Sequence, residues 1–261
     1  MKLIIVELAL VVLAAILVWV IIDRIRTKAR LRAEEDARKL KHDLTGNISH
    51  ELKTPVSSIR GYLETLVNNP DLPEEKRRFF IERSYLQSLR LTEMISDISL
   101  ITKMEEAPDQ FSLESVNIKD SFEEVLEELS EKIKKHNITV DNQLPPVYIS
   151  ANYNLLYAIF RNLLENSIKY AGDGCRVRIS VRLGADEDIF DYSDNGKGVP
   201  EEELSRIFTR FYRLNQDRGA MSSGSGLGLS IVRNAVLFHK GSITAYRPHD
   251  GGLGFRFSIK R

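Results

Sequence analysis

Two amphipathic segments in the first half of the chain constrain its fold most strongly. Apolar residues recur in steps of three and four at Leu40, Leu44, Ile48, Leu52, Val56, Ile59, Leu63 and Leu66. A second stripe follows at Leu91, Met94, Ile95, Ile98 and Ile101, after a turn at 68–73 and a helix start at Pro73. Both spacings predict one apolar face on a helix. A single antiparallel hairpin cannot bury both stripes, so we expect two copies to pair into a four-helix bundle.

The polar side of the first helix carries a histidine. At about 100° per residue, His50 falls nearly opposite the middle of the stripe, on the side of Lys53 and Ser57. A histidine in an apolar helix is more often a core residue, but this geometry predicts a solvent-facing imidazole. Pro55 removes the backbone hydrogen bond to the Glu51 carbonyl at a cost of about 3 kcal/mol. Because the stripe continues on both sides of the proline, the pattern favours a kinked, functional helix over one that ends there.

Charge and cysteine content exclude several classes of function. The 37 basic and 37 acidic residues balance, so no net field indicates a nucleic-acid partner. The single Cys175 excludes a disulfide framework and a multi-cysteine metal site. The five histidines are scattered without metal-ligand spacing.

An apolar run at the start of the chain predicts a membrane anchor. Leu3–Ile22 holds 15 Leu, Ile or Val residues and one charge, Glu7, and a run of about 20 residues can span a bilayer. The basic residues that follow are Arg24, Arg26, Lys28, Arg30 and Arg32. They predict a single-pass span with everything from Asp23 onward inside the cell. A cleavable signal peptide would have a shorter apolar region and a small-residue cleavage site.

After a linker at 105–109 the pattern changes to a mixture of strands and helices. We expect strands at 138–140, 147–150, 176–183, 189–192, 242–246 and 254–259, and helices at 119–136, 153–170, 201–208 and 227–239. The expected fold class is α+β and multidomain. It comprises a transmembrane helix (1–22), a linker helix (23–39), a dimeric helical-hairpin domain (40–106) and an α/β-sandwich domain (107–261).

Three polar side chains share one face of the helix at 153–170. Asn162, Asn166 and Lys169 stand at i, i+4 and i+7. Two amide oxygens and an ammonium suit Mg²⁺ and the phosphates that it bridges. Taken alone, such residues are more often a solvated face.

The loop after the strand at 189–192 contains Asp194, Gly196 and Gly198. A hairpin turn is the simple interpretation of Asn-Gly at this point. However, Val199–Glu203 has the pattern of a helix N-terminus, so the loop is expected to join a strand to a helix. Its glycines permit close approach of a ligand. The Asp194 carboxylate can accept a hydrogen bond from an exocyclic amine.

Glycines also precede the last expected helix. Gly224, Gly226 and Gly228 place free backbone N–H groups at a helix start, which favours an anion site. Their spacing is not that of the dinucleotide fingerprint. Phe208 and Phe211, earlier in the chain, are expected core aromatics.

The order of these motifs, from about residue 40 to 261, resembles that of the sensor histidine kinases of bacterial two-component systems. The resemblance implies a dimerisation and histidine-phosphotransfer domain followed by a Bergerat-type ATP-binding domain, with ATP and Mg²⁺ as cofactors. His50 matches the phosphorylated histidine. Glu51 matches the acidic neighbour expected to act as the base, with an ion pair to Lys53 or Arg83 as the alternative. Thr54 matches the residue that orients a water for dephosphorylation of the response regulator, with a plain surface residue as the alternative.

The remaining site residues also follow from the resemblance. Asn162 and Asn166 match the N box, with Asn166 as the direct Mg²⁺ ligand. The resemblance further implies nucleotide contacts from Lys169 and Tyr170, adenine recognition by Asp194 with Gly196 and Gly198, the F-box pair Phe208 and Phe211, a γ-phosphate contact from Arg213, and a second glycine box at Gly224, Gly226 and Gly228.

The implied protein is a homodimer in the bacterial inner membrane that phosphorylates a cytoplasmic response regulator and also dephosphorylates it. Two other functions remain open from the residues: an ATP-dependent clamp of the same superfamily, and a kinase-dead scaffold. Most relatives carry a sensing module between membrane and hairpin, where this chain has a linker of about 25 residues. The signal is then read in the membrane or through a partner, or upstream sequence is omitted.

Overall fold

The computed structural model describes Arg24, residues 46–214 and residues 225–261. The chain divides into two compact units, Met1–Lys53 and Thr54–Arg261. Residues 46–68 are helical throughout, including Pro55. The predicted span at 3–22 and most of the linker lie outside the described residues, among which no helix is long and apolar enough to cross a membrane.

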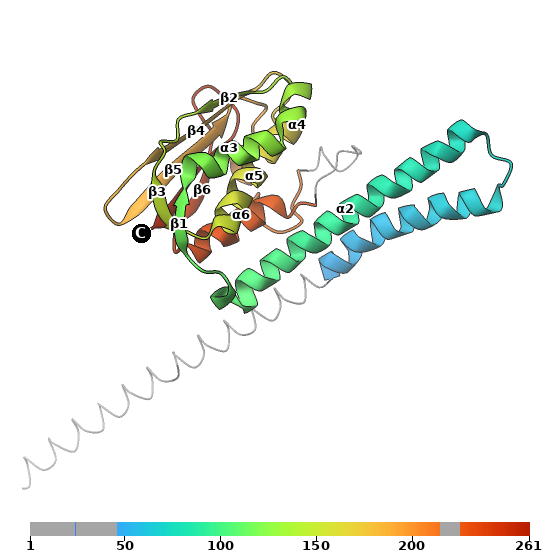
Figure 1. Ribbon diagram of the computed structural model, residues 1–261, viewed down its shortest axis with the longest axis horizontal. Helices are drawn as coiled ribbons and strands as arrows, with labels where there is room; N and C mark the ends of the chain where they lie inside the picture. Colours follow the sequence, from blue (N-terminus) through green and yellow to red (C-terminus); the bar gives the residue numbers. More distant parts are fainter. Residues whose placement is uncertain (1–23, 25–45, 215–224) are drawn as a thin grey trace, which may run out of the picture. The chain divides into compact units, whose positions relative to one another are not determined.

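The predicted second helix of the hairpin is present as α2 (Glu74–Glu106). Pro73 is its N-cap, and Glu74 and Glu75 occupy the first turn, where carboxylates interact favourably with the helix dipole. The rings of Tyr62 and Phe80 lie 5.9 Å apart and join the two helices beside the turn. Figure 1 shows the two helices running side by side from this turn.

The α/β domain has seven strands, four α-helices and two 3-10 helices among the described residues. In chain order these are η1 (Pro108–Gln110), β1 (Glu114–Asn117), α3 (Ile118–Glu128), α4 (Ser130–Lys135), β2 (Thr139–Asn142), β3 (Tyr148–Ala151), α5 (Tyr153–Tyr170), β4 (Arg176–Arg182), β5 (Glu187–Asp194), η2 (Glu201–Glu203), α6 (Gly228–Phe238), β6 (Ile243–Tyr246) and β7 (Gly254–Lys260). Five strands form a sheet in the order β2-β4-β5-β7-β6, with only the β2–β4 pair parallel. The antiparallel pair β1–β3 stands apart.

Helices α3, α5 and α6 cover one face of the sheet, which makes a two-layer sandwich (Figure 1). The central strand β5 alternates between half-buried and fully buried residues, as expected when one face of a sheet is covered. Phe160 of α5, Phe190 of β5 and Phe257 of β7 meet in the core, and the rings of Phe190 and Phe257 stack at 4.8 Å. This core fixes α5 and the end of β5, the two elements that carry most of the predicted site.

Two expectations from the sequence are corrected, and one strand was missed. The expected helix at 201–208 is the 3-10 helix η2 followed by turns, because hydrogen bonds there mostly span three residues, as from Thr209 N–H to the Arg206 carbonyl. The expected helix at 119–136 is two helices that meet at the buried Leu129, whose ψ of 7° departs from α-helical values. Strand β1 was not predicted, since Glu114–Asn117 has only one fully buried residue to mark it.

Candidate functional site

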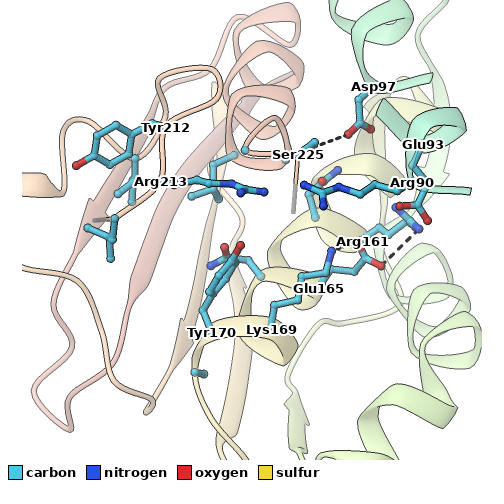
Figure 2. A pocket seen from close by; sticks show the side chains of 18 of the residues that line it. Arg90, Glu93, Asp97, Arg161, Glu165, Lys169, Tyr170, Tyr212, Arg213 and Ser225 are labelled. Atoms are coloured by element: carbon cyan, nitrogen blue, oxygen red, sulfur yellow. Dashed lines mark hydrogen bonds and ion pairs between the residues drawn. The ribbon is translucent and has the colours of Figure 1, made fainter. Parts of the chain in front are cut away.

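A cavity of about 890 Å³ lies between α5, the loop after β5, the start of α6 and one side of α2. Figure 2 shows several of the charged side chains that line it. Nine of the predicted site residues line this cavity: Asn162, Asn166, Lys169, Tyr170, Asp194, Gly198, Arg213, Gly226 and Gly228. Elements more than 60 residues apart in the chain are thus brought to one place by the sandwich.

Asp194 lines this cavity, and the residue is only 5% exposed. Its Oδ1 accepts hydrogen bonds from the backbone N–H groups of Gly196 (3.0 Å) and Leu253 (3.2 Å). Its Oδ2 accepts one from the Ser167 hydroxyl at 2.8 Å, and that hydroxyl accepts one from Tyr192 at 3.0 Å. Burial raises the pKa of Tyr192 well above its usual value, so the phenol stays a donor. The network fixes the carboxylate in one orientation.

The glycines of the loop after β5 are required by close packing. A Cβ on Gly196 would lie 2.4 Å from the Ala171 Cα, at the end of α5. Gly198 has a φ of 69°, and a Cβ there would lie 2.6 Å from the Gly252 carbonyl oxygen. Gly196 itself does not line the cavity, so its contribution is to let the loop reach α5.

Asn162 and Gly228 connect the middle of α5 to the start of α6. The Asn162 amide nitrogen donates to the Ala158 carbonyl at 2.8 Å, which leaves its Oδ1 facing α6. A Cβ on Gly228 would lie 2.7 Å from that oxygen. Only glycine therefore allows the helix start to approach the amide this closely.

The two phenylalanines of the predicted F box are structural neighbours of the cavity and do not line it. Phe208 is buried and meets Phe255 edge-to-face at 6.0 Å. Phe211 has a φ of 60°, and its N–H donates to the Gly226 carbonyl at 2.9 Å. This bond joins the two chain segments that flank residues 215–224, where Gly224 lies outside the described residues.

Most cations on the α5 side of the cavity are already paired. Glu165 accepts ion pairs from Lys132 (2.9 Å), Lys169 (3.3 Å) and Arg161 (3.5 Å). Arg161 also pairs with Glu128 at 3.0 Å. Burial raises the pKa of Glu165, but the charges of Lys169 and Arg161 outweigh it and leave that pKa below its usual value. Glu165 therefore stays ionised and holds these cations in place.

On the opposite side, α2 contributes side chains that the sequence did not indicate. Asp97 accepts a hydrogen bond from the Ser225 hydroxyl at 3.1 Å (Figure 2). Burial raises the pKa of Asp97, and the Ser225 bond offsets this only in part. Lower on α2, Glu105 pairs with Arg210 and accepts a hydrogen bond from Asn234 at 3.4 Å. Polar contacts therefore join α2 to the α/β domain on both sides of residues 215–224: Arg210 contacts α2 before this segment, and Ser225 contacts it after.

The predicted hairpin residues lie on the helix over residues 46–68. His50 is exposed, as its position opposite the apolar stripe predicted, and Glu51 is half-buried. Thr54 is exposed, and its carbonyl accepts the Ser58 hydroxyl at 3.0 Å.

Three further residues of the site escaped the sequence analysis: Ser167, Asp97 and Arg90. A signal existed for Ser167, which lies four residues after Leu163 and so on the buried face of α5 next to Asn166. No local pattern marks Asp97 or Arg90, because only the tertiary contact with α2 brings them to the cavity.

The donor set suits Mg²⁺ carried by phosphates rather than a protein-caged metal. In the described part of the chain, no cluster of three or more His, Cys, Asp or Glu side chains can hold a metal ion. Mg²⁺ retains several waters and needs few protein ligands when phosphates supply the others. The Asn166 amide, which lines the cavity, fits that role.

Two separate parts of the chain match two protein families. Residues 40–107 match the His Kinase A (phospho-acceptor) domain, and residues 151–261 match the histidine kinase-, DNA gyrase B-, and HSP90-like ATPase. The sensor-like histidine kinase SenX3 of Mycolicibacterium smegmatis is 30% identical over 259 residues, covering 90% of this chain and 65% of SenX3. The sensor histidine kinase YcbM of Bacillus subtilis is 28% identical over 226 residues, covering 86% of this chain and 72% of YcbM.

Solved structures show the same fold. The Acinetobacter baumannii histidine kinase AdeS has a TM-score of 0.67 at 20% identity, over 81% of this chain and 97% of AdeS. The histidine kinase ThkA, in complex with the response regulator TrrA, has a TM-score of 0.66 at 21% identity, over 84% of this chain and 61% of ThkA. The chain spans about two thirds of the length of SenX3. With both family matches in the expected order, the chain belongs to the sensor histidine kinases of two-component systems.

Proposed function

We propose that this protein phosphorylates itself on His50 from ATP and passes the phosphoryl group to an aspartate of a response regulator. The observation that carries the proposal is the convergence of Asn166, Asp194, Gly226 and Gly228 on one cavity in the ATPase-like domain. The exposed imidazole of His50, in a family-matched phospho-acceptor domain, supplies the nucleophile.

Each part of the cavity suits one part of the nucleotide. The oriented Asp194 carboxylate accepts from the exocyclic amine of adenine. The backbone at Gly226 and Gly228 and the Arg213 guanidinium suit the phosphates. Asn166 would hold Mg²⁺, which supplies charge neutralisation at the phosphates when bound.

In the chemical step, a neutral ring nitrogen of His50 attacks the γ-phosphorus of ATP. The bond from that phosphorus to the β–γ bridging oxygen breaks, and ADP leaves. Glu51, the adjacent carboxylate, accepts the proton from the other ring nitrogen. Transfer to the regulator then moves the phosphoryl group from nitrogen to a carboxylate oxygen.

The hairpin surface supports a homodimer. Large apolar side chains remain exposed on its two helices: Val56, Leu63, Val67, Phe79, Ile81, Tyr85, Leu86, Leu89 and Ile95. So many exposed apolar side chains on one pair of helices mark an interface. Pairing with a second hairpin would complete the four-helix bundle expected from the two stripes.

The domain boundaries and cell location complete the proposal. We place a single-pass inner-membrane anchor at 1–22, a linker at 23–39, the dimerisation and phosphotransfer domain at 40–106 and the catalytic domain at 107–261, on the cytoplasmic side. The complex of ThkA with TrrA supports a response regulator as the partner class. Thr54 would orient the water that hydrolyses the regulator's phospho-aspartate.

The decisive experiment is labelling with ATP that carries ³²P on the γ-phosphate. The His50→Gln variant should lose acid-labile, alkali-stable label while retaining nucleotide binding, and Asp194→Asn should lose both. Label that persists in His50→Gln would refute the assignment. An ATP-dependent clamp, by contrast, would hydrolyse ATP without ever forming phosphohistidine.

The phosphatase role of Thr54 needs a separate measurement. Thr54→Ala should keep autophosphorylation near the wild-type rate and slow dephosphorylation of the phosphorylated regulator. Ser57→Ala, at a neighbouring exposed hydroxyl of the same helix, is the matched control. Equal loss of both activities in Thr54→Ala would contradict the water-orienting role.

A further inference from the structure

Arg90 is a half-buried arginine of α2 that faces the nucleotide cavity and not the core of the hairpin (Figure 2). Its Nε is fully buried and has no hydrogen-bond partner among the described residues. No ion pair within 4 Å is found for its guanidinium in that part of the chain either. A buried, charged donor without a partner is costly, so such a group requires an explanation.

Arg213 on the other wall of the cavity is in the same state. Its Nη2 is also buried without a partner in the described part of the protein, and it too lines the cavity. In contrast, Lys132, Arg161 and Lys169 all share the carboxylate of Glu165. Of the seven Lys and Arg side chains that line the cavity, only Arg90 and Arg213 hold a buried nitrogen without a hydrogen-bond partner among the described residues. These two arginines lie on opposite walls, one on α2 and one before α6.

The acidic neighbours of Arg90 do not satisfy it. Asp97, two turns further along α2, is engaged by Ser225 at 3.1 Å. Glu93, one turn further, lines the cavity without an ion pair to Arg90 within 4 Å among the described residues. Guanidinium groups are the donors best suited to phosphate oxygens, because several N–H groups match them in one plane.

We propose that Arg90 is a phosphate ligand carried by α2, which together with Arg213 binds the terminal phosphate of the nucleoside triphosphate. This inference rests on the proposed nucleotide function of the cavity and extends it to the hairpin. Its consequence is that the nucleotide joins α2 to the α/β domain. ATP then strengthens the contact between them, and ADP, which lacks the terminal phosphate, does not.

The test compares two ligands by calorimetry on the full chain with Mg²⁺: ADP, and the ATP analogue with an imido group between the β- and γ-phosphorus. Loss of a charge-assisted hydrogen bond predicts that Arg90→Gln weakens the analogue about tenfold or more. Binding of ADP should stay within about twofold of wild type, which also shows that the variant is folded. Arg90→Lys should recover part of the affinity, since it retains the charge. The matched control is Arg78→Gln, at an exposed arginine of α2 outside the cavity.

A second measurement asks whether the two arginines hold the same group. If they do, the losses of Arg90→Gln and Arg213→Gln for the analogue should not add in the double variant. Equal weakening of ADP and analogue in Arg90→Gln, or no weakening of either, would overturn the proposal while leaving the nucleotide function intact. If the wild-type chain bound neither ligand, the proposed function itself would fail.

Discussion

The hydroxyl of Ser167 lies 2.8 Å from Oδ2 of Asp194 and is itself the acceptor for the Tyr192 phenol at 3.0 Å. All three side chains are buried, and the chain of hydrogen bonds runs from the core of the sandwich to Asp194, which lines the cavity. A packing residue of β5 thereby controls the direction of the carboxylate proposed to read adenine.

Ser167→Ala should weaken adenine-nucleotide binding without abolishing it. The variant removes one donor from a buried carboxylate that keeps its two backbone donors. We expect a total loss of about 1.5–3 kcal/mol, divided between the free energy of nucleotide binding and the free energy of unfolding. Calorimetry with ADP and thermal unfolding would measure the two contributions. Ser115→Ala, at an exposed serine of β1, should change neither. Unchanged ADP affinity in Ser167→Ala would show that the network does not orient Asp194.

Two glycines at helical positions should respond to alanine in opposite ways. At Gly228 the new Cβ would lie 2.7 Å from Asn162 Oδ1, so Gly228→Ala should displace the amide and reduce nucleotide affinity. At Gly61 nothing lies within 4 Å, and alanine should raise helix stability by about 0.5–1 kcal/mol. Thermal unfolding and ADP titration of both variants would check this. Full nucleotide affinity in Gly228→Ala would contradict the tight approach of α6 to α5.

The sequence predicted the elements whose signals are local. The helix at 153–170 agrees with α5 at both ends, because its apolar period and its Asn152 N-cap are complete within the segment. The start of α2 after Pro73 was predicted for the same reason. The solvent-facing position of His50 followed from the angle between it and the stripe.

Features that depend on tertiary contact were missed. Strand β1 forms only because β3 pairs with it, and its own four residues carry no alternating pattern. The contributions of Arg90 and Asp97 to the cavity depend on α2 lying against the α/β domain. No periodicity within α2 separates these two positions from an ordinary solvated face.

Stability should fall between neutral and mildly acidic pH, in part through His239. This residue is 4% exposed; its Nδ1–H donates to the Ala235 carbonyl at 2.7 Å, and its Nε2 accepts the Asn152 N–H at 2.9 Å. Burial lowers the pKa of His239, and the bond to Ala235 offsets this only in part.

The folded state therefore binds this proton less readily than the unfolded chain does. The stability from neutral His239 is fully present above the ordinary histidine pKa of about 6.5 and is lost as the pH falls through the lower folded-state pKa. Urea unfolding at several pH values should show that the free energy of unfolding falls less steeply with decreasing pH in His239→Gln than in wild type. His249→Gln, at a fully exposed histidine, should keep the wild-type slope. Parallel slopes for His239→Gln and wild type would exclude this histidine as the source.

The exposed stripe on the hairpin makes a prediction about assembly. Leu63 is 47% exposed in a single chain, so Leu63→Glu should cost little within one hairpin but should bury a carboxylate if two hairpins pair. Light scattering coupled to size exclusion should then show a shift from dimer to monomer. Leu113, 55% exposed in the α/β domain, provides the matched control, and Leu113→Glu should leave the mass unchanged. If Leu63→Glu stayed dimeric with wild-type stability, the exposed stripe would not be the dimer interface, and the two chains would have to pair through a different surface.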